Sequence, residues 1–257
     1  MQISTATACR TPTFLAREEW KTLPWSANSS EKDLVQHLLD HLADIPGLLA
    51  LYDSLMAATR ANSLPLSEIL DRRAMFELSV ADIQHRLYKW KREYADPAGQ
   101  PFEVPNQVED LGGPDDPSNR DFRFPIFRCR DMSSGTLISP PPIAYPDPEL
   151  ARALCLYYAA LLTVSFVDIR KEGGLLPHER YDLACVICRS TAYTLQAVPN
   201  HSHRVLGSLR VAYDTLPEGG IERQWVVNMF HVIGKAEQVK ATAQLAKPFS
   251  VLANASQ

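Results

Sequence analysis

One carboxylate is the first candidate for chemistry, because it follows a strongly apolar run. Asp168 comes directly after Phe166 and Val167, near the end of segment 150–170. Burial raises the pKa of a carboxyl group, and a carboxyl with a raised pKa can act as a general acid or base. Asp168 is therefore the predicted catalytic residue. The alternative interpretation is an ion pair with Arg189 or another cation.

A second group of side chains could line a ligand pocket, because each joins an apolar body to a polar tip. Aromatic residues of this kind can orient a ligand in an apolar cavity. They are equally typical of a helical core, and the sequence leaves both interpretations open. The predicted ligand-binding residues are Trp90, Tyr157, Tyr158, Arg189, Tyr193, Trp225 and His231.

Cysteines and histidines supply weaker patterns. Cys185 and Cys188 have the C-x-x-C spacing, but a redox pair is favoured at a helix N-terminus, and these thiols lie within an apolar helical pattern. We expect them to pack in the core. His37 and His41 are four residues apart, which would place both on one helix face. We expect a solvent-exposed face there and predict no metal.

Histidines also occur at positions 201 and 203, in a polar stretch that is typical of a loop.

In the sequence, no serine–histidine–aspartate order, glycine-rich phosphate loop or paired-carboxylate motif stands out. We therefore expect no cofactor.

The elements that would position these residues are helices. Ser30 is predicted to cap a helix with Asp33 at the capping-box position, and leucines follow at spacings of three and four. Pro46 can end that helix and start the next, and Pro65 can open a third. Segment 150–170 is apolar on nearly every face, which predicts a central, surrounded helix. Further helices are predicted at 181–195, 206–216 and 222–247.

The segment 96–148 has a different composition. It contains most of the 19 prolines, and proline lacks a backbone donor and fixes φ, so regular helix is not expected. We expect 111–119 to be mobile. The side chains expected to pack along the core are Phe122, Phe124, Ile126 and Phe127. The predicted fold is all-α, a single domain over residues 1–257 that includes this irregular segment.

The composition limits the kinds of partner that the chain can be expected to bind. The chain has 257 residues, 46% hydrophobic, with a formal net charge of -4, so no basic field favours binding to a phosphate backbone. Residues 153–167 form the most apolar run, which is shorter than the ~20 residues of a membrane span. No signal peptide is expected at 1–10. Five cysteines, an odd number, favour reduced thiols and an intracellular location in the cytoplasm or nucleus.

Three blocks of sequence carry a family resemblance. The first reads FLAREEWKTLPW and DLVQHLLDHLADIPGLLALYDSL, within 14–55. The second reads PIAYPDPELARALCLYYAALL. The third, within 184–234, reads ACVICRSTAYTLQ, LGSLRVAYDTL and ERQWVVNMFHVIG. In this order they resemble the fungal-specific regulatory domain that follows the DNA-binding cluster of binuclear zinc-cluster transcription factors.

This resemblance implies an all-α, nuclear, regulatory domain, often encoded near metabolic gene clusters. It also implies a DNA-binding module with six cysteines around two zinc ions. Only Cys185 and Cys188 are closely spaced here, so direct DNA binding is not carried over to this chain.

Two functions remain open at this point. The first is a helical cavity, used in fungal secondary metabolism, that binds an apolar biosynthetic intermediate and steers its cyclisation as a cofactor-free, pericyclase-like enzyme. The alternative is a transcriptional regulator or co-regulator that acts without its own DNA contact, as a homodimer or paired with a full-length relative. A truncated, functionless gene product is a third interpretation. No membrane span and no direct nucleic-acid partner are predicted.

Overall fold

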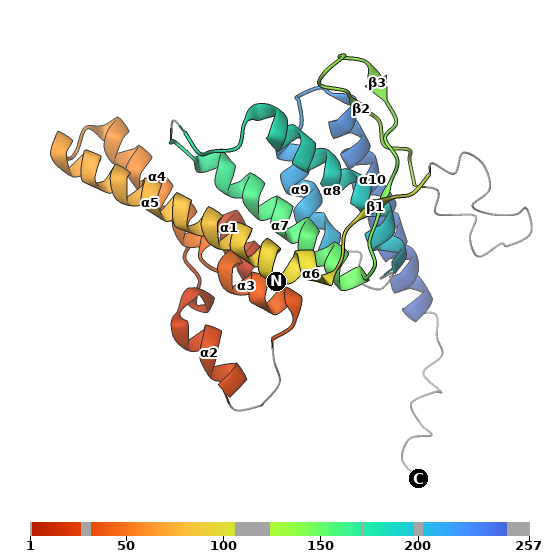
Figure 1. The fold of residues 1–257 in the computed structure, drawn as a ribbon, viewed down its shortest axis with the longest axis horizontal. Helices are drawn as coiled ribbons and strands as arrows, with labels where there is room; N and C mark the ends of the chain where they lie inside the picture. Colours follow the sequence, from red (N-terminus) through yellow and green to blue (C-terminus); the bar gives the residue numbers. More distant parts are fainter. Residues whose placement is uncertain (1, 27–31, 106–123, 171, 198–202, 246–257) are drawn as a thin grey trace, which may run out of the picture.

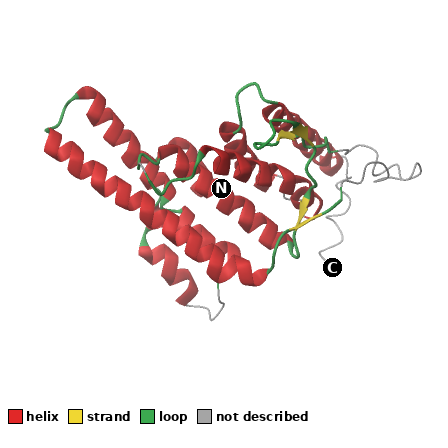
Figure 2. Ribbon diagram, turned by 45° about the horizontal axis from the view of Figure 1, so that its top comes forward, coloured by secondary structure: helices red, strands yellow, loops and turns green. Residues whose placement is uncertain are grey.

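The computed structural model describes residues 2–26, 32–105, 124–170, 172–197 and 203–245. Helices dominate these residues, as Figure 2 shows, and the all-α prediction is confirmed. The long helices, in chain order, are α1 (Gln2–Cys9), α2 (Glu18–Ser26), α3 (Leu34–Leu42), α4 (Ile45–Ala61), α5 (Leu66–Trp90), α7 (Pro148–Val167), α8 (Pro177–Ala197), α9 (His203–Thr215) and α10 (Ile221–Leu245). The short elements are a 3-10 turn (Phe14–Ala16), a π-helical turn (Lys91–Ala95), α6 (Asp96–Ala98), β1 (Phe102–Glu103), β2 (Cys129–Arg130), β3 (Leu137–Ile138) and β4 (Ile143–Ala144).

Helix α7 lies at the centre of the fold (Figure 1). Its start follows the sequence prediction, because the Asp147 carboxylate accepts a hydrogen bond from the Leu150 N–H at 3.0 Å and Pro148 occupies the first turn. It packs against α3, α4 and α5 on the one hand and against α8 and α9 on the other. A helix that is apolar on every side is stable in water only when neighbours cover each side, and these five helices do so.

The same helix is long and apolar enough to cross a membrane. It has 20 residues, and its most apolar 18-residue stretch has a mean hydropathy of 1.7, but 72% of that stretch is buried inside the protein. The expectation that this run is too short was therefore wrong, whereas the prediction of a buried core helix is confirmed.

Two apolar clusters meet at α7. The first joins α7 to α3, α4 and α5, with side chains such as Leu38, Phe76 and Leu87 fully buried. The second joins α8, α9 and α10 to the opposite side of α7, where Leu162 is 0% exposed. Helix α10 packs against α9, so it lies one layer further from α7 than α8 does.

Helix α3 begins one turn later than predicted. Asp33 is itself the N-cap and accepts from the Gln36 N–H at 2.7 Å, while the Gln36 side chain accepts from the Asp33 N–H at 2.8 Å. Ser30, the predicted cap, lies outside the described residues. The predicted roles of the two prolines are confirmed, because Pro46 lies in the first turn of α4 and Pro65 precedes α5.

Several helix boundaries differ from the sequence prediction. Helix α1 was not predicted at all, since its eight residues bury no side chain fully and show little apolar periodicity. The central helix ends at Val167 instead of continuing to 170, because Asp168 adopts an extended conformation. Helix α5 continues through the π-helical turn into α6 rather than ending near its cationic residues.

Within the residues that the structure describes, the segment 96–147 is irregular apart from α6 and four two-residue strands. Strand β1 pairs with β4, and β2 pairs with β3, both antiparallel. Phe127 is buried and Phe124 is partly buried against the second cluster, as predicted, but Ile126 is 60% exposed and does not join the core. Phe122 and the stretch 111–119 lie outside the described residues.

Candidate functional site

The predicted catalytic carboxylate is held in an ion pair. The Asp168 side chain, 4% exposed, lies 2.8 Å from Nη2 of Arg170 and accepts further hydrogen bonds from the Arg170 backbone N–H and from Gln84. Desolvation alone would raise the pKa of Asp168, but the hydrogen bonds and charge of Arg170 outweigh it and lower the pKa. The expectation of a raised pKa was wrong. The alternative prediction, an ion pair with a cation, is confirmed with Arg170 in place of Arg189.

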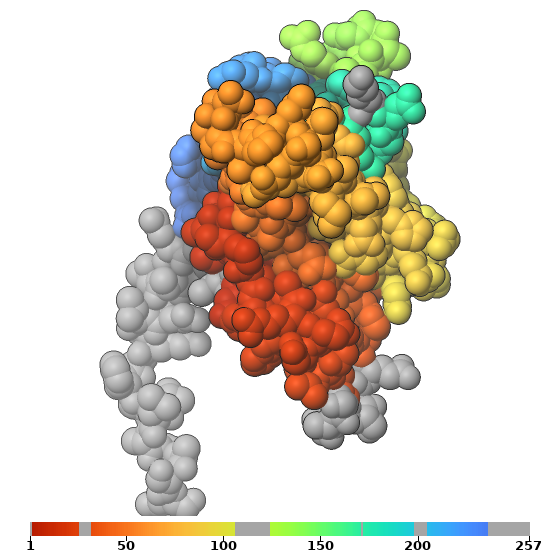
Figure 3. All heavy atoms as spheres, turned by 90° about the vertical axis from the view of Figure 1, so that its left-hand side faces the viewer, coloured from red at the N-terminus to blue at the C-terminus, as the bar shows by residue number. Residues whose placement is uncertain are grey.

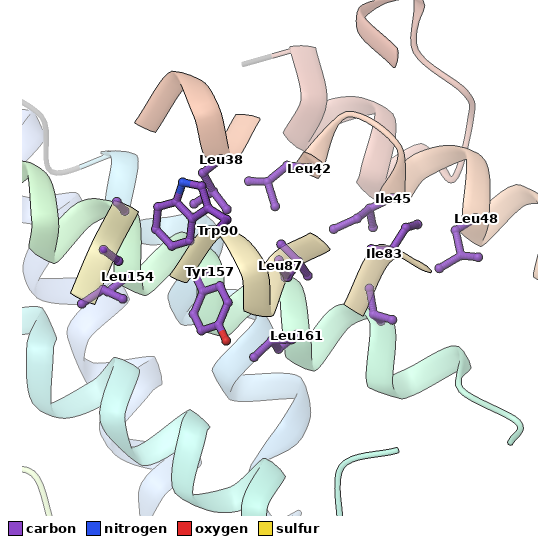
Figure 4. Close-up of a cluster of buried hydrophobic side chains, with 14 of the residues drawn as sticks. Leu38, Leu42, Ile45, Leu48, Ile83, Leu87, Trp90, Leu154, Tyr157 and Leu161 are labelled. Atoms are coloured by element: carbon purple, nitrogen blue, oxygen red, sulfur yellow. The ribbon is translucent and has the colours of Figure 1, made fainter. Parts of the chain in front are cut away.

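Trp90 and Tyr157 are core residues in the first cluster, as Figure 4 shows. Their ring centroids are 5.6 Å apart, and the Trp90 indole N–H donates to the Leu34 carbonyl at 3.2 Å. Tyr158 packs edge-on against Tyr157 at 5.4 Å. Burial raises the pKa of Tyr157, and it raises the pKa of Tyr158 to about 12. Both hydroxyls therefore stay protonated at neutral pH.

Three other predicted ligand-binding residues bind the chain itself. Arg189 Nε donates to the carbonyl of Pro141 at 2.8 Å, and its Nη2 pairs with Glu103. The Tyr193 hydroxyl donates to the carbonyl of Tyr145 at 2.7 Å. The Trp225 indole N–H donates to the carbonyl of Pro125 at 2.7 Å. All three acceptors belong to the proline-rich segment.

Proline explains this pattern. A proline residue still offers its carbonyl as a hydrogen-bond acceptor. It has no backbone N–H of its own, however, so it cannot complete the backbone pairing of a regular element. Side-chain donors on α8 and α10 take the place of that pairing. His231 joins none of these contacts, because it is exposed on α10. Arg189, Tyr193 and Trp225 therefore fasten the proline-rich segment to α8 and α10.

Sequence reasoning missed a buried polar cluster between β2, α8 and α10. The Glu222 side chain belongs to a residue that is only 1% exposed, and it accepts from the Tyr181 hydroxyl at 2.7 Å and from the Arg130 N–H at 3.0 Å. The same N–H lies 2.9 Å from the Tyr181 oxygen. Burial and the hydrogen bond to Glu222 raise the pKa of Tyr181.

The available signal for Glu222 was its place in the first turn of a helix, where the helix dipole favours a carboxylate. Nothing in the sequence pairs it with residues 41 and 92 positions away.

The cysteine pattern fits the structural interpretation, whereas the histidine patterns do not: His37 and His41 are half-buried instead of solvent-exposed. Cys185 and Cys188 are both buried on α8, in the second cluster. His37 stacks on Tyr94 with ring centroids 4.3 Å apart, and His41 is partly buried with a pKa lowered by desolvation and by Arg86. Position 201 lies outside the described residues, and position 203 begins α9 instead of lying in a loop. Across the described ranges, no group of three histidine, cysteine or acidic residues could hold a metal ion.

A surface groove between α4 and α5 was not predicted. It encloses about 440 Å³, with Leu48 and Ile83 buried at its floor. Leu51, Met75 and Leu78 line its walls and remain 38%, 64% and 66% exposed. The groove therefore offers solvent a row of large apolar side chains.

The groove lies on an extension of the fold. Helices α4 and α5 pack side by side and reach beyond the other helices at the left of Figure 1. Figure 3 looks along that direction and shows the orange atoms of this hairpin above the red N-terminal helices. Oppositely charged pairs flank the apolar walls along α5, Glu68 with Arg72 at 2.7 Å and Asp82 with Arg86 at 2.9 Å.

A second groove of about 520 Å³ lies between α3 and the π-helical turn. Its polar residues already have partners, since Lys32 pairs with Asp40 and donates to the Lys21 carbonyl, and His37 stacks on Tyr94. Leu34 is the one large aliphatic residue among those lining it. The α4–α5 groove is lined by more large apolar residues than this second groove, and it is the candidate functional site.

Comparison of the chain with protein-family models, with curated proteins and with solved structures finds no match.

We predict that Asp168→Asn destabilises the protein by about 1–3 kcal/mol at pH 7, because Arg170 loses a charged acceptor. The native pKa of Asp168 is lowered, so its stabilisation is present above the unfolded value of about 3.9 and is lost as the pH falls through the native pKa. The stability difference between wild type and variant, measured by urea unfolding, should therefore shrink below about pH 4.

The control is Asp214→Asn, which breaks an exposed pair with Arg210 and should cost less than about 1 kcal/mol. A difference for Asp168→Asn that stays constant from pH 7 to pH 3 would contradict the assignment.

We predict that Glu222→Ala destabilises the protein by about 2–3 kcal/mol, because the Tyr181 hydroxyl loses its buried carboxylate acceptor and the Arg130 N–H keeps only the Tyr181 oxygen. Glu222→Gln should recover part of this loss, since its amide oxygen can accept the same hydrogen bonds. Glu218→Ala, at an exposed position nearby, should change stability by no more than about 0.5 kcal/mol. Equal effects at positions 218 and 222 in urea unfolding would refute a structural role for the buried cluster.

Proposed function

We propose that the chain is a helical regulatory module that acts by pairing with a second copy of itself through α4 and α5. The observation that carries the proposal is the solvent-exposed apolar groove with Leu51, Met75 and Leu78 along its walls. Large apolar groups grouped in this way mark interaction surfaces more often than isolated exposed residues do. The resemblance to the regulatory domain of zinc-cluster transcription factors supports the regulatory part.

The charges beside the groove favour a second copy as the partner. Consider two α5 helices packed antiparallel with their crossing point at Glu77. Arg72 and Asp82 lie five residues on either side of this point, so Arg72 of one copy faces Asp82 of the other. Glu68 and Arg86 lie nine residues on either side and pair in the same way. Each of these four charges in one copy therefore meets its opposite in the other.

The apolar side chains fall between these charges. Met75 and Leu78 lie within two residues of the crossing point, so these side chains of both copies would lie close to the two-fold axis. Helix α5 is about 37 Å long at ~1.5 Å per residue, which is ample for a contact of ~800 Å² per partner. Apolar residues at the centre and charges at the rim are typical of specific interfaces.

The enzyme hypothesis has less support. The side chains that would have formed its pocket beside α7 bind the chain itself, and the proposed catalyst Asp168 is neutralised by Arg170. A cyclase site would need a poised acid or a hydrogen-bond donor facing an open cavity. In the α4–α5 groove the charged lining residues Asp44, Asp82 and Arg86 are paired with one another.

We predict that the purified chain forms a dimer that Leu78→Glu dissociates, because a buried glutamate at the interface would lack a partner. Sedimentation velocity over a concentration series should show the dissociation constant rise at least tenfold, which corresponds to about 1.4 kcal/mol. The matched control is Leu66→Glu, since Leu66 is 71% exposed on the same helix but far from the groove, and it should dimerise like wild type.

The antiparallel register has a sharper test. Arg72→Asp alone and Asp82→Arg alone should each weaken the dimer, because each places like charges opposite one another. The double variant restores opposite charges across the interface while leaving like charges within each helix, so it should dimerise better than either single variant. A monomer at every concentration, or equal effects of Leu66→Glu and Leu78→Glu, would refute the proposed pairing.

The regulatory role has its own expected outcome. Fused to an unrelated DNA-binding domain, the wild-type chain and Leu66→Glu should alter expression of a reporter gene equally, and Leu78→Glu should not. A wild-type fusion that leaves expression unchanged would count against regulation. If polyene or polycyclic metabolites raise the melting temperature of wild type and of Leu78→Glu alike, the small-molecule hypothesis is favoured instead.

A further inference from the structure

Strand β2 is fastened to α8 at one point. The Tyr181 hydroxyl lies 2.9 Å from the Arg130 N–H and 3.2 Å from the Arg130 carbonyl, so it bonds both polar groups of one strand residue. Cys129 directly precedes Arg130, and Cys185 lies one helical turn after Tyr181 on the same face of α8. The fastening therefore brings the two cysteines together.

The two thiols are neighbours in the second cluster. Cys129 is 5% exposed and Cys185 is 7% exposed. The Cys185 thiol donates a hydrogen bond to the Cys129 sulfur, which lowers the pKa of Cys129 and raises the pKa of Cys185. The thiolate form is the nucleophile in thiol oxidation, so Cys129 is the sulfur that reacts first.

We propose that Cys129 and Cys185 are a redox-active pair that a peroxide converts into a disulfide between β2 and α8. The Cys129 thiolate attacks one oxygen of hydrogen peroxide, which breaks the O–O bond and leaves a sulfenic acid and hydroxide. The Cys185 sulfur then attacks the Cys129 sulfur and displaces the sulfenic oxygen as water. In sum, two thiols and one peroxide give one disulfide and two water molecules.

The remaining cysteines do not offer the same chemistry. Cys188 lies on α8 beside Cys185, but it is 1% exposed, and burial raises the pKa of its thiol. Cys155 lies on α7, and its pKa is raised to about 12 by burial. Cys9 is exposed and has no cysteine partner among the described residues. The C-x-x-C motif is thus one half of the pair, and the other half is a cysteine 56 residues earlier in the chain.

This disulfide would make the fastening of the proline-rich segment covalent. It would join β2, and through the β2–β3 pairing β3, to the second cluster. The proposal concerns α8, β2 and the second cluster, whereas the dimer proposal concerns α4 and α5. The failure of either proposal in its test would therefore leave the other unaffected.

The test uses the full chain with Cys9→Ser and Cys188→Ala, which removes the exposed thiol and the ambiguous neighbour. Of five cysteines, three remain. After treatment with hydrogen peroxide and denaturation, the free thiols should fall from three to one. Trypsin then releases Cys129 in the dipeptide 129–130 and Cys185 in the peptide 181–189. Mass spectrometry should find these two peptides joined, and dithiothreitol should separate them.

Two further variants in this background serve as controls. Cys155→Ala should keep the link between 129–130 and 181–189, and Cys129→Ser should lose it. If Cys129→Ser does not fold, the peptide map of the parent protein decides by itself. The proposal is overturned if peptide 181–189 is recovered unlinked, is joined to the peptide that contains Cys155, or carries a sulfinic or sulfonic acid in place of a disulfide.

Discussion

The fold depends on covering a helix that has no polar side. Helix α7 carries apolar side chains around almost its whole circumference. Because burial of apolar surface contributes about 25 cal/mol per Å², an arrangement that left one side of α7 in water would be less stable. The chain solves this with helices from both of its halves, α3 to α5 on one flank and α8 with α9 on another. Both apolar clusters therefore include α7, and neither half has a complete core alone.

The proline-rich segment is the second consequence of this arrangement. It connects the halves, and in its described residues the strand pairing is limited to four two-residue strands. Side chains of α8 and α10 supply the missing donors, at Pro125, Pro141 and Tyr145. The residues that looked suited to hold a ligand by type alone, an arginine, a tyrosine and a tryptophan, have the same chemistry as is needed to hold a backbone carbonyl. Residue type did not distinguish the two uses.

What could be read from the sequence followed from local rules. The Asp147 cap, the two helix-starting prolines and the apolar periodicity act over a few residues, and these predictions are confirmed. The pairing of Asp168 with Arg170 was within reach for the same reason, since the residues are two apart, yet the cation expected at first was the distant Arg189. The Glu222 cluster joins residues that are remote in sequence. The α4–α5 groove depends on how the two helices pack against each other. Periodicity contains no information on either.

The fastening of the proline-rich segment has a consequence for sequence change. A backbone carbonyl is present at every position, whatever the side chain, so the hydrogen bonds that Arg189, Tyr193 and Trp225 donate follow the path of the segment. Substitutions at the acceptor positions leave those carbonyls in place, whereas a substitution at any of the three donors removes the hydrogen bond. Over evolutionary time the acceptor positions are therefore freer to change than the donors, except where the side chain also packs, as the Tyr145 ring does against Tyr193.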